Sequence, residues 1–263
     1  MVHPGDMLPV QVEPIKMRRR AIIVGASSGI GAALARRLAA EGYTLALLAR
    51  RADLLEALCD EINSTVGESR AIPCIHDVLD YDSVPGLLQK ITAQLGGLDL
   101  FIYNSGISLP SGIDQYEFEK DRRVTEVNYL GALAWLNPVA AMFQHWRTGQ
   151  IVGISSVAGE RGRVGNPSYH ASKAALSCYL ESLRNRLTRL GVHVLTVKPG
   201  YVRTDMISGL KNPIFAIPAK SAASEICAAI RRRKQVVYTA PVWKLVMFVV
   251  RNIPSIIFRR LSI

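Results

Sequence analysis

The chain has 263 residues, of which 49% are hydrophobic and 20% charged, and its 32 Lys and Arg against 21 Asp and Glu give a formal net charge of +11. This composition excludes a disordered chain, which needs low hydrophobicity and a high density of net charge, and 20 Gly and 13 Pro exclude a collagen-like or low-complexity repeat. Eight basic and no acidic residues lie in 226–263, so residues 1–225 carry only +3, which indicates a basic C-terminal patch rather than a general surface for nucleic acid.

Apolar runs alternate with helical stretches from residue 21 onward. Strands are expected at 21–25, 44–49, 71–75, 99–103, 150–154, 193–197 and 235–238, and helices at 29–41, 53–66, 83–95, 117–146, 169–190 and 222–232. The strands are continuous Val, Ile and Leu runs, as in parallel sheets that helices cover on both faces. Regular alternation of strands and helices predicts an α/β fold, a single doubly wound Rossmann-type domain with a mostly parallel seven-stranded sheet.

The chain divides into three parts. Residues 1–17 lack the charged and apolar regions of a signal peptide and are expected to form a flexible N-terminal arm. Residues 18–240 form the Rossmann-type domain, and residues 241–263 form a basic, amphipathic C-terminal tail. The four cysteines form no CxxC pair and have no histidine cluster beside them, so we expect reduced thiols and neither a disulfide framework nor a metal site.

A glycine-rich segment, Gly25-Ala-Ser-Ser-Gly29-Ile-Gly31, joins the first strand to its helix. Glycines permit a tight turn and let the backbone approach a ligand closely. The N-terminus of the following helix offers free N–H groups and a partial positive charge, which suit a pyrophosphate. A merely structural turn is the alternative. The residues expected to contact a dinucleotide cofactor here are Gly25, Ser27, Ser28, Gly29, Ile30 and Gly31.

The end of the second strand indicates which dinucleotide is bound. Folds that prefer NAD place an acid there, about 20 residues after the glycines, to hold the ribose 2′-hydroxyl. Here the chain reads Ala49-Arg50-Arg51, with no carboxylate to repel a 2′-phosphate and a guanidinium placed to hold one. Arg50 is therefore expected to bind the 2′-phosphate, and NADP(H) is the predicted cofactor; two solvated arginines are the alternative.

A Tyr–Lys pair opens the predicted helix at residue 169. Tyr169 and Lys173 are four residues apart and share one helix face, and Ser156 lies thirteen residues earlier at the end of a strand. A lysine ammonium, and an oxidised nicotinamide ring, favour the phenolate and so lower the tyrosine pKa from its usual value near 10. His170 is expected to point elsewhere, and Ser155 to face the opposite side of its strand.

These motifs occur in one order along about residues 20–240: Gly25-x-x-x-Gly29-x-Gly31, Asn104-Ser-Gly106, Asn128, Ser156, Tyr169-x-x-x-Lys173 and Pro199-Gly200. Together they resemble the short-chain dehydrogenase/reductase family. The resemblance implies hydride exchange between nicotinamide C4 and a carbonyl or alcohol carbon, with Tyr169 as general acid/base. It implies that Ser156 hydrogen-bonds the reacting oxygen, and that Lys173 lowers the Tyr169 pKa and holds the nicotinamide ribose.

The same resemblance assigns further residues. It implies that Asn128 maintains a proton relay behind the lysine, that Asp77 contacts the adenine and that Thr204 contacts the carboxamide. The other cofactor contacts that it implies are Val78, Asn104, Gly106, Pro199, Gly200 and Val202. The chain departs from the family pattern at Tyr103, which replaces an amide, at Ser105, which replaces Ala, and at Val24, which replaces Thr.

The tail contains aromatic and aliphatic residues with interspersed basic ones, and its longest uncharged apolar run is 245–250. A membrane span needs about 20 apolar residues, so segments lying in a membrane interface are expected instead. Packing on the body or in an oligomer interface is the alternative. The stretch 155–161 and the C-terminal stretch 251–259 also resemble one subgroup, the decaprenylphosphoryl-2-keto-erythro-pentose reductases.

The predicted function is therefore NADP(H)-dependent carbonyl reduction, or the reverse alcohol oxidation, with a lipid-linked keto-sugar at a membrane surface as the suggested substrate. A soluble oligomeric ketoreductase of sterol-like or acyl substrates is one alternative, and a non-catalytic NADP sensor or scaffold is another. A homo-oligomer is expected and nucleic acid is not. The expected location is the cytoplasm, against the inner face of the cell membrane if the tail binds lipid.

Overall fold

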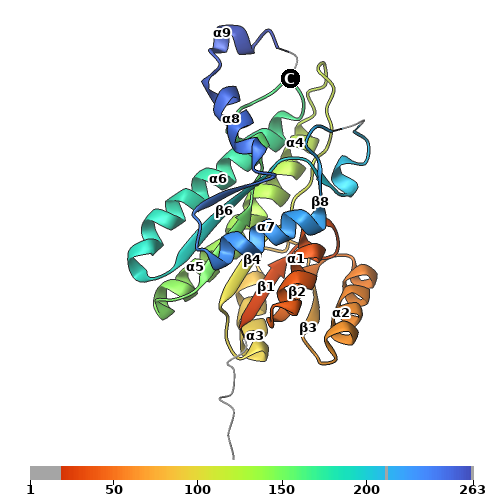
Figure 1. Ribbon diagram of the computed structural model, residues 1–263, viewed down its shortest axis with the longest axis vertical. Coiled ribbons are helices and arrows are strands. Elements are labelled where there is room, and N and C mark those ends of the chain that lie inside the picture. The colour runs from red at the N-terminus through yellow and green to blue at the C-terminus, as the bar shows by residue number, and fades with distance from the viewer. Residues whose placement is uncertain (1–18, 211–212, 262–263) are drawn as a thin grey trace, which may run out of the picture.

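The computed structural model describes residues 19–210 and 213–261, so the expected arm at 1–17 lies outside the described residues (Figure 1). Seven strands form one sheet in the order β3-β2-β1-β4-β5-β6-β9, and every neighbouring pair is parallel. This confirms the predicted doubly wound α/β sheet. The strands are β1 (Arg20–Val24), β2 (Thr44–Ala49), β3 (Ala71–Ile75), β4 (Leu100–Tyr103), β5 (Gln150–Ile154), β6 (His193–Pro199) and β9 (Val236–Thr239).

Helices cover both faces of this sheet, as Figure 1 shows. The α-helices of the described residues are α1 (Gly29–Ala40), α2 (Ala52–Val66), α3 (Val84–Leu95), α4 (Phe118–Thr125), α5 (Gly131–Trp146), α6 (Pro167–Leu187), α7 (Ala219–Arg231), α8 (Val242–Asn252) and α9 (Ser255–Phe258), of which the last two lie beyond the sheet. One core cluster joins α1, α2 and α7 to the sheet, and a second joins α3, α5 and α6. Successive β1 residues alternate between them, since Ile22 belongs to the second cluster and Ile23 to the first.

The expected helix at 117–146 is interrupted. The chain forms α4, then a π-helix, η1 (Glu126–Leu130), and then α5. Insertions of this kind are rare and often mark functional sites. Asn128 lies in η1 with its side chain fully buried, so the irregular turn places a polar group inside the fold. A helical hydrophobic period does not reveal such an insertion.

The strand order reverses direction between β1 and β4. In open α/β sheets, ligands bind at such a switch point, beyond the carboxyl ends of the strands. The glycine-rich loop follows β1, the Asn104 loop follows β4, and Ser156 follows β5. A short strand pair, β7 (Val202–Arg203) and β8 (Ile217–Pro218), lies beyond β6 and was not predicted. The topology thus gathers the motif-bearing loops at one end of the sheet.

The tail forms α8 and α9, which lie at the upper end of the molecule in Figure 1. Trp243 and Met247 on the inner face of α8 are buried in a small cluster with Val157 and Ala240. The outer face is exposed, with Leu245 67% and Phe248 60% exposed. Among the described residues, no helix has both the length and the apolar character needed to cross a bilayer.

Candidate active site

The loop after β1 contains glycines at positions where a larger side chain would clash with neighbouring atoms. Gly25 has φ +88°, a backbone conformation that favours glycine. A Cβ on Gly31 would lie 2.1 Å from the carbonyl oxygen of Gly25, and Asn104 Nδ2 donates to that same oxygen over 2.6 Å. The loop therefore brings its backbone against the N-terminus of α1 with no side chain in between. This cradle fits the pyrophosphate of a dinucleotide.

The two arginines after β2 point in different directions. The Arg51 guanidinium donates to Ser27 Oγ over 2.9 Å and to Ser28 Oγ over 2.6 Å. Arg50 lies with Nη1 3.6 Å from the Asp77 carboxylate. The motif reasoning chose Arg50 alone. The structure also brings Arg51 onto the phosphate loop, and the only sequence signal for it was its adjacency to Arg50.

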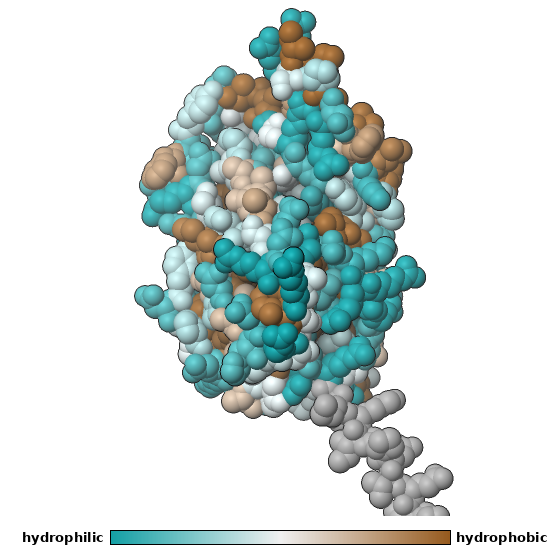
Figure 2. Space-filling view, turned by 90° about the vertical axis from the view of Figure 1, so that its left-hand side faces the viewer, coloured by the Kyte–Doolittle hydropathy of each residue, from teal (hydrophilic) through white to brown (hydrophobic). Residues whose placement is uncertain are grey.

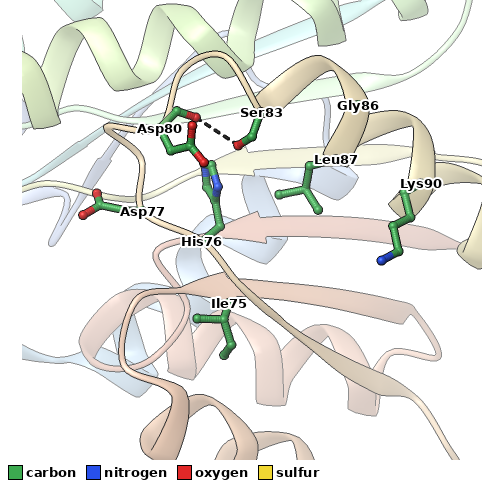
Figure 3. A pocket seen from close by; sticks show the side chains of 8 residues that line it. All are labelled: Ile75, His76, Asp77, Asp80, Ser83, Gly86, Leu87 and Lys90. Carbon is green, nitrogen blue, oxygen red and sulfur yellow. Dashed lines mark hydrogen bonds between the residues drawn. The ribbon is translucent and has the colours of Figure 1, made fainter.

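Asp77 and Val78 follow β3 on the side where an adenine is expected. Asp77 Oδ1 accepts from the Leu79 N–H over 3.1 Å, and Val78 is buried. A cavity of about 520 Å³ adjoins Asp77 and is otherwise lined by residues at the end of β3, in the segment that follows it and in α3. In Figure 3 the Asp77 carboxylate points away from the Leu87 and Lys90 side chains of this cavity. Asp77 therefore lies at the edge of the cavity, with its carboxylate directed toward Arg50.

Ser156 caps the short 3₁₀-helix η2 (Val157–Glu160), which follows β5. Its Oγ accepts from the Ala158 N–H over 3.0 Å and donates to the Pro199 carbonyl over 3.4 Å. His170 Nδ1 lies 2.7 Å from the Ala158 carbonyl, so the nitrogen must donate there. His170 therefore fastens the first turn of α6 to the Ser156 turn, a role that the sequence did not indicate. Ser155 faces α6 instead and contacts Ser177 Oγ over 2.7 Å, as the strand alternation predicts.

Tyr169 and Lys173 lie on one face of α6, as their spacing predicts. Lys173 Nζ is 6.0 Å from the centre of the Tyr169 ring and donates to the Ile154 carbonyl over 3.0 Å. Lys173 is 3% exposed, and burial lowers its pKa to about 8. Burial raises the pKa of Tyr169, while the hydrogen bond with Ser156 acts in the opposite direction. The three side chains therefore meet at the carboxyl end of β5.

The pKa direction of Tyr169 differs from the sequence expectation. A neighbouring ammonium was expected to lower this pKa, but removal of the phenol from water opposes ionisation more strongly than the protein's own groups favour it. Lys173 is itself desolvated, which weakens its hold on a proton. Spacing along a helix predicts which side chains are neighbours, and it does not predict how much water surrounds them.

Both the oxygen and the nitrogen of the Asn128 side-chain amide form hydrogen bonds within the protein. Its Oδ1 accepts from the Ile107 N–H over 2.7 Å, and its Nδ2 donates to the Ile107 carbonyl and to Ser172 Oγ. A Cβ on Gly106 would lie 3.1 Å from Lys173 Nζ and 3.3 Å from Asn128 Oδ1. Gly106 thus leaves room for the lysine and the asparagine to approach the same loop. Asn128 fixes that loop beside Lys173.

The departure from the family pattern at Tyr103 has a structural solution. The Tyr103 ring is completely buried, and its hydroxyl donates to the Val127 carbonyl over 2.8 Å, so the polar group is satisfied. Asn104, the next residue, keeps its contact with the glycine loop. The contact between the loops that follow β1 and β4 is therefore kept, although a tyrosine replaces the amide at position 103.

The segment after β6 closes the other side of the site. A Cβ on Gly29 would lie 3.0 Å from Thr204 Cγ2, so Thr204 lies against the glycine-rich loop. Val202 is buried and pairs with Ile217. A cavity of about 470 Å³ lies beneath the following loop, and its lining includes Thr204. Pro199 and Gly200 end β6 next to Ser156.

Comparison with known proteins agrees with this geometry. The family model described as short chain dehydrogenase matches residues 19–213. An uncharacterized oxidoreductase of Mycobacterium tuberculosis is 32% identical over 216 residues, which cover 82% of this chain and 85% of that protein. The 3-oxoacyl-[acyl-carrier-protein] reductase FabG of Staphylococcus aureus is 30% identical over 201 residues, covering 76% and 81%.

Solved structures show the same fold. A short-chain dehydrogenase from Sphingobium yanoikuyae, solved in complex with NADPH, superposes with a TM-score of 0.77 at 25% identity and covers 90% of this chain and 97% of its own. A short-chain type dehydrogenase/reductase from Mycobacterium marinum has the same TM-score at 25% identity, with 86% and 95% covered. The chain therefore belongs to the short-chain dehydrogenase/reductase family, the oxidoreductases that act on alcohol and carbonyl groups.

Proposed function

We propose that this protein is an NADP(H)-dependent reductase of ketones. The observation that carries the proposal is the convergence of Ser156, Tyr169 and Lys173 at the carboxyl end of β5, one strand away from the glycine-rich cradle that follows β1 and β4. A proton donor, a hydrogen-bond donor and a buried cation are the groups that reduction of a carbonyl requires. Reduced nicotinamide, when bound, supplies the hydride.

Each residue has a distinct part in this proposal. Tyr169 donates its phenolic proton to the carbonyl oxygen as that oxygen gains negative charge, and its raised pKa keeps the proton in place until then. Ser156 donates a hydrogen bond to the same oxygen. Lys173 places positive charge beside the phenol and holds the nicotinamide ribose. Asn128 fixes the Gly106–Ile107 loop and supports proton return behind Lys173.

We propose that Arg50 and Arg51 together produce the preference for NADP(H) over NAD(H). Arg51 contacts two hydroxyls of the glycine-rich loop, and Arg50 precedes it at the end of β2 with its guanidinium beside Asp77. The solved relative from Sphingobium yanoikuyae, which is in complex with NADPH, supports this choice. Binding should be measured by fluorescence titration with NADPH and NADH. Equal affinities for the two in the wild type, or an unchanged preference in Arg50→Asp and Arg51→Asp, would refute the assignment.

Activity is tested by NADPH oxidation with a panel of ketones. Tyr169→Phe should bind NADPH normally and lose at least about a hundred-fold in kcat, since a positioned general acid contributes about 10²–10⁴-fold. Near-normal turnover by Tyr169→Phe would refute its role. Wild-type protein that binds NADPH and reduces no ketone would instead support the sensor or scaffold alternative.

We further infer that the substrate is amphipathic and that the tail contacts an anionic membrane. Exposed apolar side chains gather at the end of the molecule that carries α8 and α9, which Figure 2 shows as brown patches near its top. Those on the tail and the nearby loop include Leu245, Phe248, Val249, Ile256, Ile257 and Ile214. Lys244, Arg251, Arg259 and Arg260 are exposed beside them, and each basic residue near an anionic surface contributes about 1 kcal/mol.

Flotation with anionic liposomes tests the membrane contact. Because Trp243 and Met247 pack inward, deleting the tail would uncover the body, so the better variant is Leu245→Gln with Phe248→Gln on the outer face. Leu54→Gln, a 41% exposed position on α2, is the matched control. We expect salt-sensitive flotation that only the double variant loses. If the wild type does not float, the membrane contact is wrong.

The substrate class is tested in the same ketone panel. A keto-sugar carried on a lipid should be reduced faster than the same keto-sugar without the lipid, which the local resemblance of residues 251–259 to the decaprenylphosphoryl-2-keto-erythro-pentose reductases suggests. No gain from the lipid would refute this choice. A preference for 3-oxoacyl thioesters would favour the acyl alternative, which the similarity to a 3-oxoacyl-[acyl-carrier-protein] reductase supports.

Three further expectations remain part of the proposal. The unit that binds NADP(H) and catalyses the reaction spans residues 18–240. A homo-oligomer forms through α5 and α6, where Trp146 is 40% exposed and Cys178 is exposed; light scattering after size exclusion tests it. The protein works in the cytoplasm, with the tail against the inner face of the cell membrane, which fractionation of cells tests.

A further inference from the structure

Arg161 joins the C-terminal tail to the turn that carries Ser156. It directly follows η2, the turn that Ser156 caps. Its Nη1 donates to the carbonyl oxygens of Val250 and Ile253, each over 2.6 Å, at the C-terminal end of α8. The last carbonyls of a helix have no N–H partner within the helix and carry partial negative charge, so a guanidinium there satisfies both needs.

The same guanidinium also holds α9. Its central carbon lies 3.8 Å from the centre of the Phe258 ring, within the range of a cation–π contact. One side chain of the body therefore contacts both helices of the tail. An arginine suits this position because its planar group can stack on a ring while its N–H groups reach carbonyls, which a lysine cannot do.

Glu160, the preceding residue, makes a second connection. Its side chain is 2% exposed, and its Oε1 accepts from Lys198 Nζ over 2.7 Å and from the Tyr238 hydroxyl. Arg251 of α8 approaches its other oxygen at 3.5 Å, an ion-pair distance. A buried carboxylate is tolerated only with such partners. Because Lys198 immediately precedes Pro199, Glu160 links the Ser156 turn, the end of β6 and the tail.

Trp243 supports the same region from the other side. It is 3% exposed, and its ring packs edge-on against Tyr201 at 5.6 Å and Phe215 at 6.1 Å. A Cβ on Gly200 would lie only 1.9 Å from Trp243 Nε1. The indole thus fills the space behind the Pro199–Gly200 turn, so the tail contacts both segments that flank the proposed reaction centre.

We propose that the tail, through its residues 241–258, is a positioning element of the active site, which acts through Arg161, Glu160 and Trp243 to hold the Ser156 turn against the Pro199–Gly200 turn. This rests on the proposed role of Ser156. None of the three residues is a catalytic residue. The glycine-rich cradle follows β1, and Arg51 reaches it from the end of β2, so loosening the tail disturbs the orientation of the ketone more than the grip on the phosphates.

The test compares Arg161→Ala with Arg161→Lys and with Arg232→Ala in the full chain. Arg232→Ala removes an exposed charge outside the tail and outside the Arg161 contacts, so it controls for charge alone. We expect Arg161→Ala to lose ten- to a hundred-fold in kcat, the size of effect that a small misplacement produces, with a smaller factor of change in the Kd for NADPH. Arg161→Lys should recover part of kcat, and Arg232→Ala should match the wild type.

Hydrogen–deuterium exchange gives a readout that does not depend on activity. The Ala158 N–H donates to Ser156 Oγ and the Gly159 N–H donates to the Ser156 carbonyl, so both amides report the order of this turn. They should exchange faster in Arg161→Ala and not in Arg232→Ala. The inference would be overturned if folded Arg161→Ala kept the wild-type kcat and the wild-type exchange rates. It would also be overturned if the loss of activity were fully explained by a smaller fraction of folded protein. If the wild type reduced no ketone, the proposed function would be refuted, and the exchange rates would still test whether the tail orders the Ser156 turn.

Discussion

Alkaline pH should suppress ketone reduction through Lys173. Burial lowers the Lys173 pKa from 10.5 to about 8, because the ammonium is only 3% exposed to water. Burial raises the pKa of Tyr169 above its usual value of 10.0, so the phenol keeps its proton across the same range. The group that titrates between about pH 7 and pH 10 is therefore the lysine and not the tyrosine.

The direction and size of the effect follow from this pKa. A lysine is charged below its pKa, and the charged form is the one proposed to act, so activity is complete at low pH and is lost as the pH rises. With a pKa of about 8, half of the lysine is charged near pH 8. About one tenth is charged one unit higher, so kcat/KM for the ketone should lie about ten-fold below its plateau near pH 9.

The assay is kcat/KM for a ketone at saturating NADPH, measured at constant ionic strength from about pH 6 to pH 10. Lys173→Arg is the matched control, because a guanidinium keeps its proton throughout this range, so whatever activity it retains should not fall near pH 8. A midpoint near 10.5, the ordinary lysine value, would refute the argument from burial. The same alkaline fall in Lys173→Arg would show that another group titrates.

Two further changes test the cradle and the core. Gly31→Ala places a methyl group 2.1 Å from the Gly25 carbonyl oxygen, so NADPH affinity should fall at least about ten-fold in a fluorescence titration, whereas Gly86→Ala, with nothing within 4 Å, should bind normally. Arg184→Met removes donors to Thr196 Oγ1 and to two backbone carbonyls, and the unpaired groups should lower the free energy of unfolding by about 3 kcal/mol in urea. Exposed Arg186→Met is its control, and an equal loss in both variants would contradict the role given to buried Arg184.

The fold could be predicted from the sequence because its determinants are local. Continuous apolar runs such as 44–49 and 100–103 indicate strands covered on both faces, and their alternation with helices indicates a parallel sheet. The structure confirms this sheet. The spacing of Tyr169 and Lys173 predicted a shared helix face, and this inference needs only the period of the helix. The resemblance to the short-chain dehydrogenase/reductase family, rather than periodicity, selected Ser156 as their partner.

Other properties depend on residues far apart in the chain. Arg50 and Arg51 are indistinguishable by pattern, and only the folded loop brings Arg51 onto Ser27 and Ser28. The pKa of Tyr169 moves opposite to the expected direction, because it depends on how completely the surrounding segments exclude water.

The tail shows the same division most clearly. Its composition predicted an amphipathic, basic segment, and the helix α8 is amphipathic. Composition alone did not show whether the apolar residues of the tail face lipid, another subunit or the body of the protein. In the fold, Trp243 and Met247 pack against the body, while Leu245 and Phe248 remain exposed. The sequence by itself determined the fold, the cradle and the meeting of Ser156, Tyr169 and Lys173. Only the tertiary structure decided which arginine contacts the loop, how far each group is desolvated and what Arg161 binds, because these depend on contacts that no local spacing encodes.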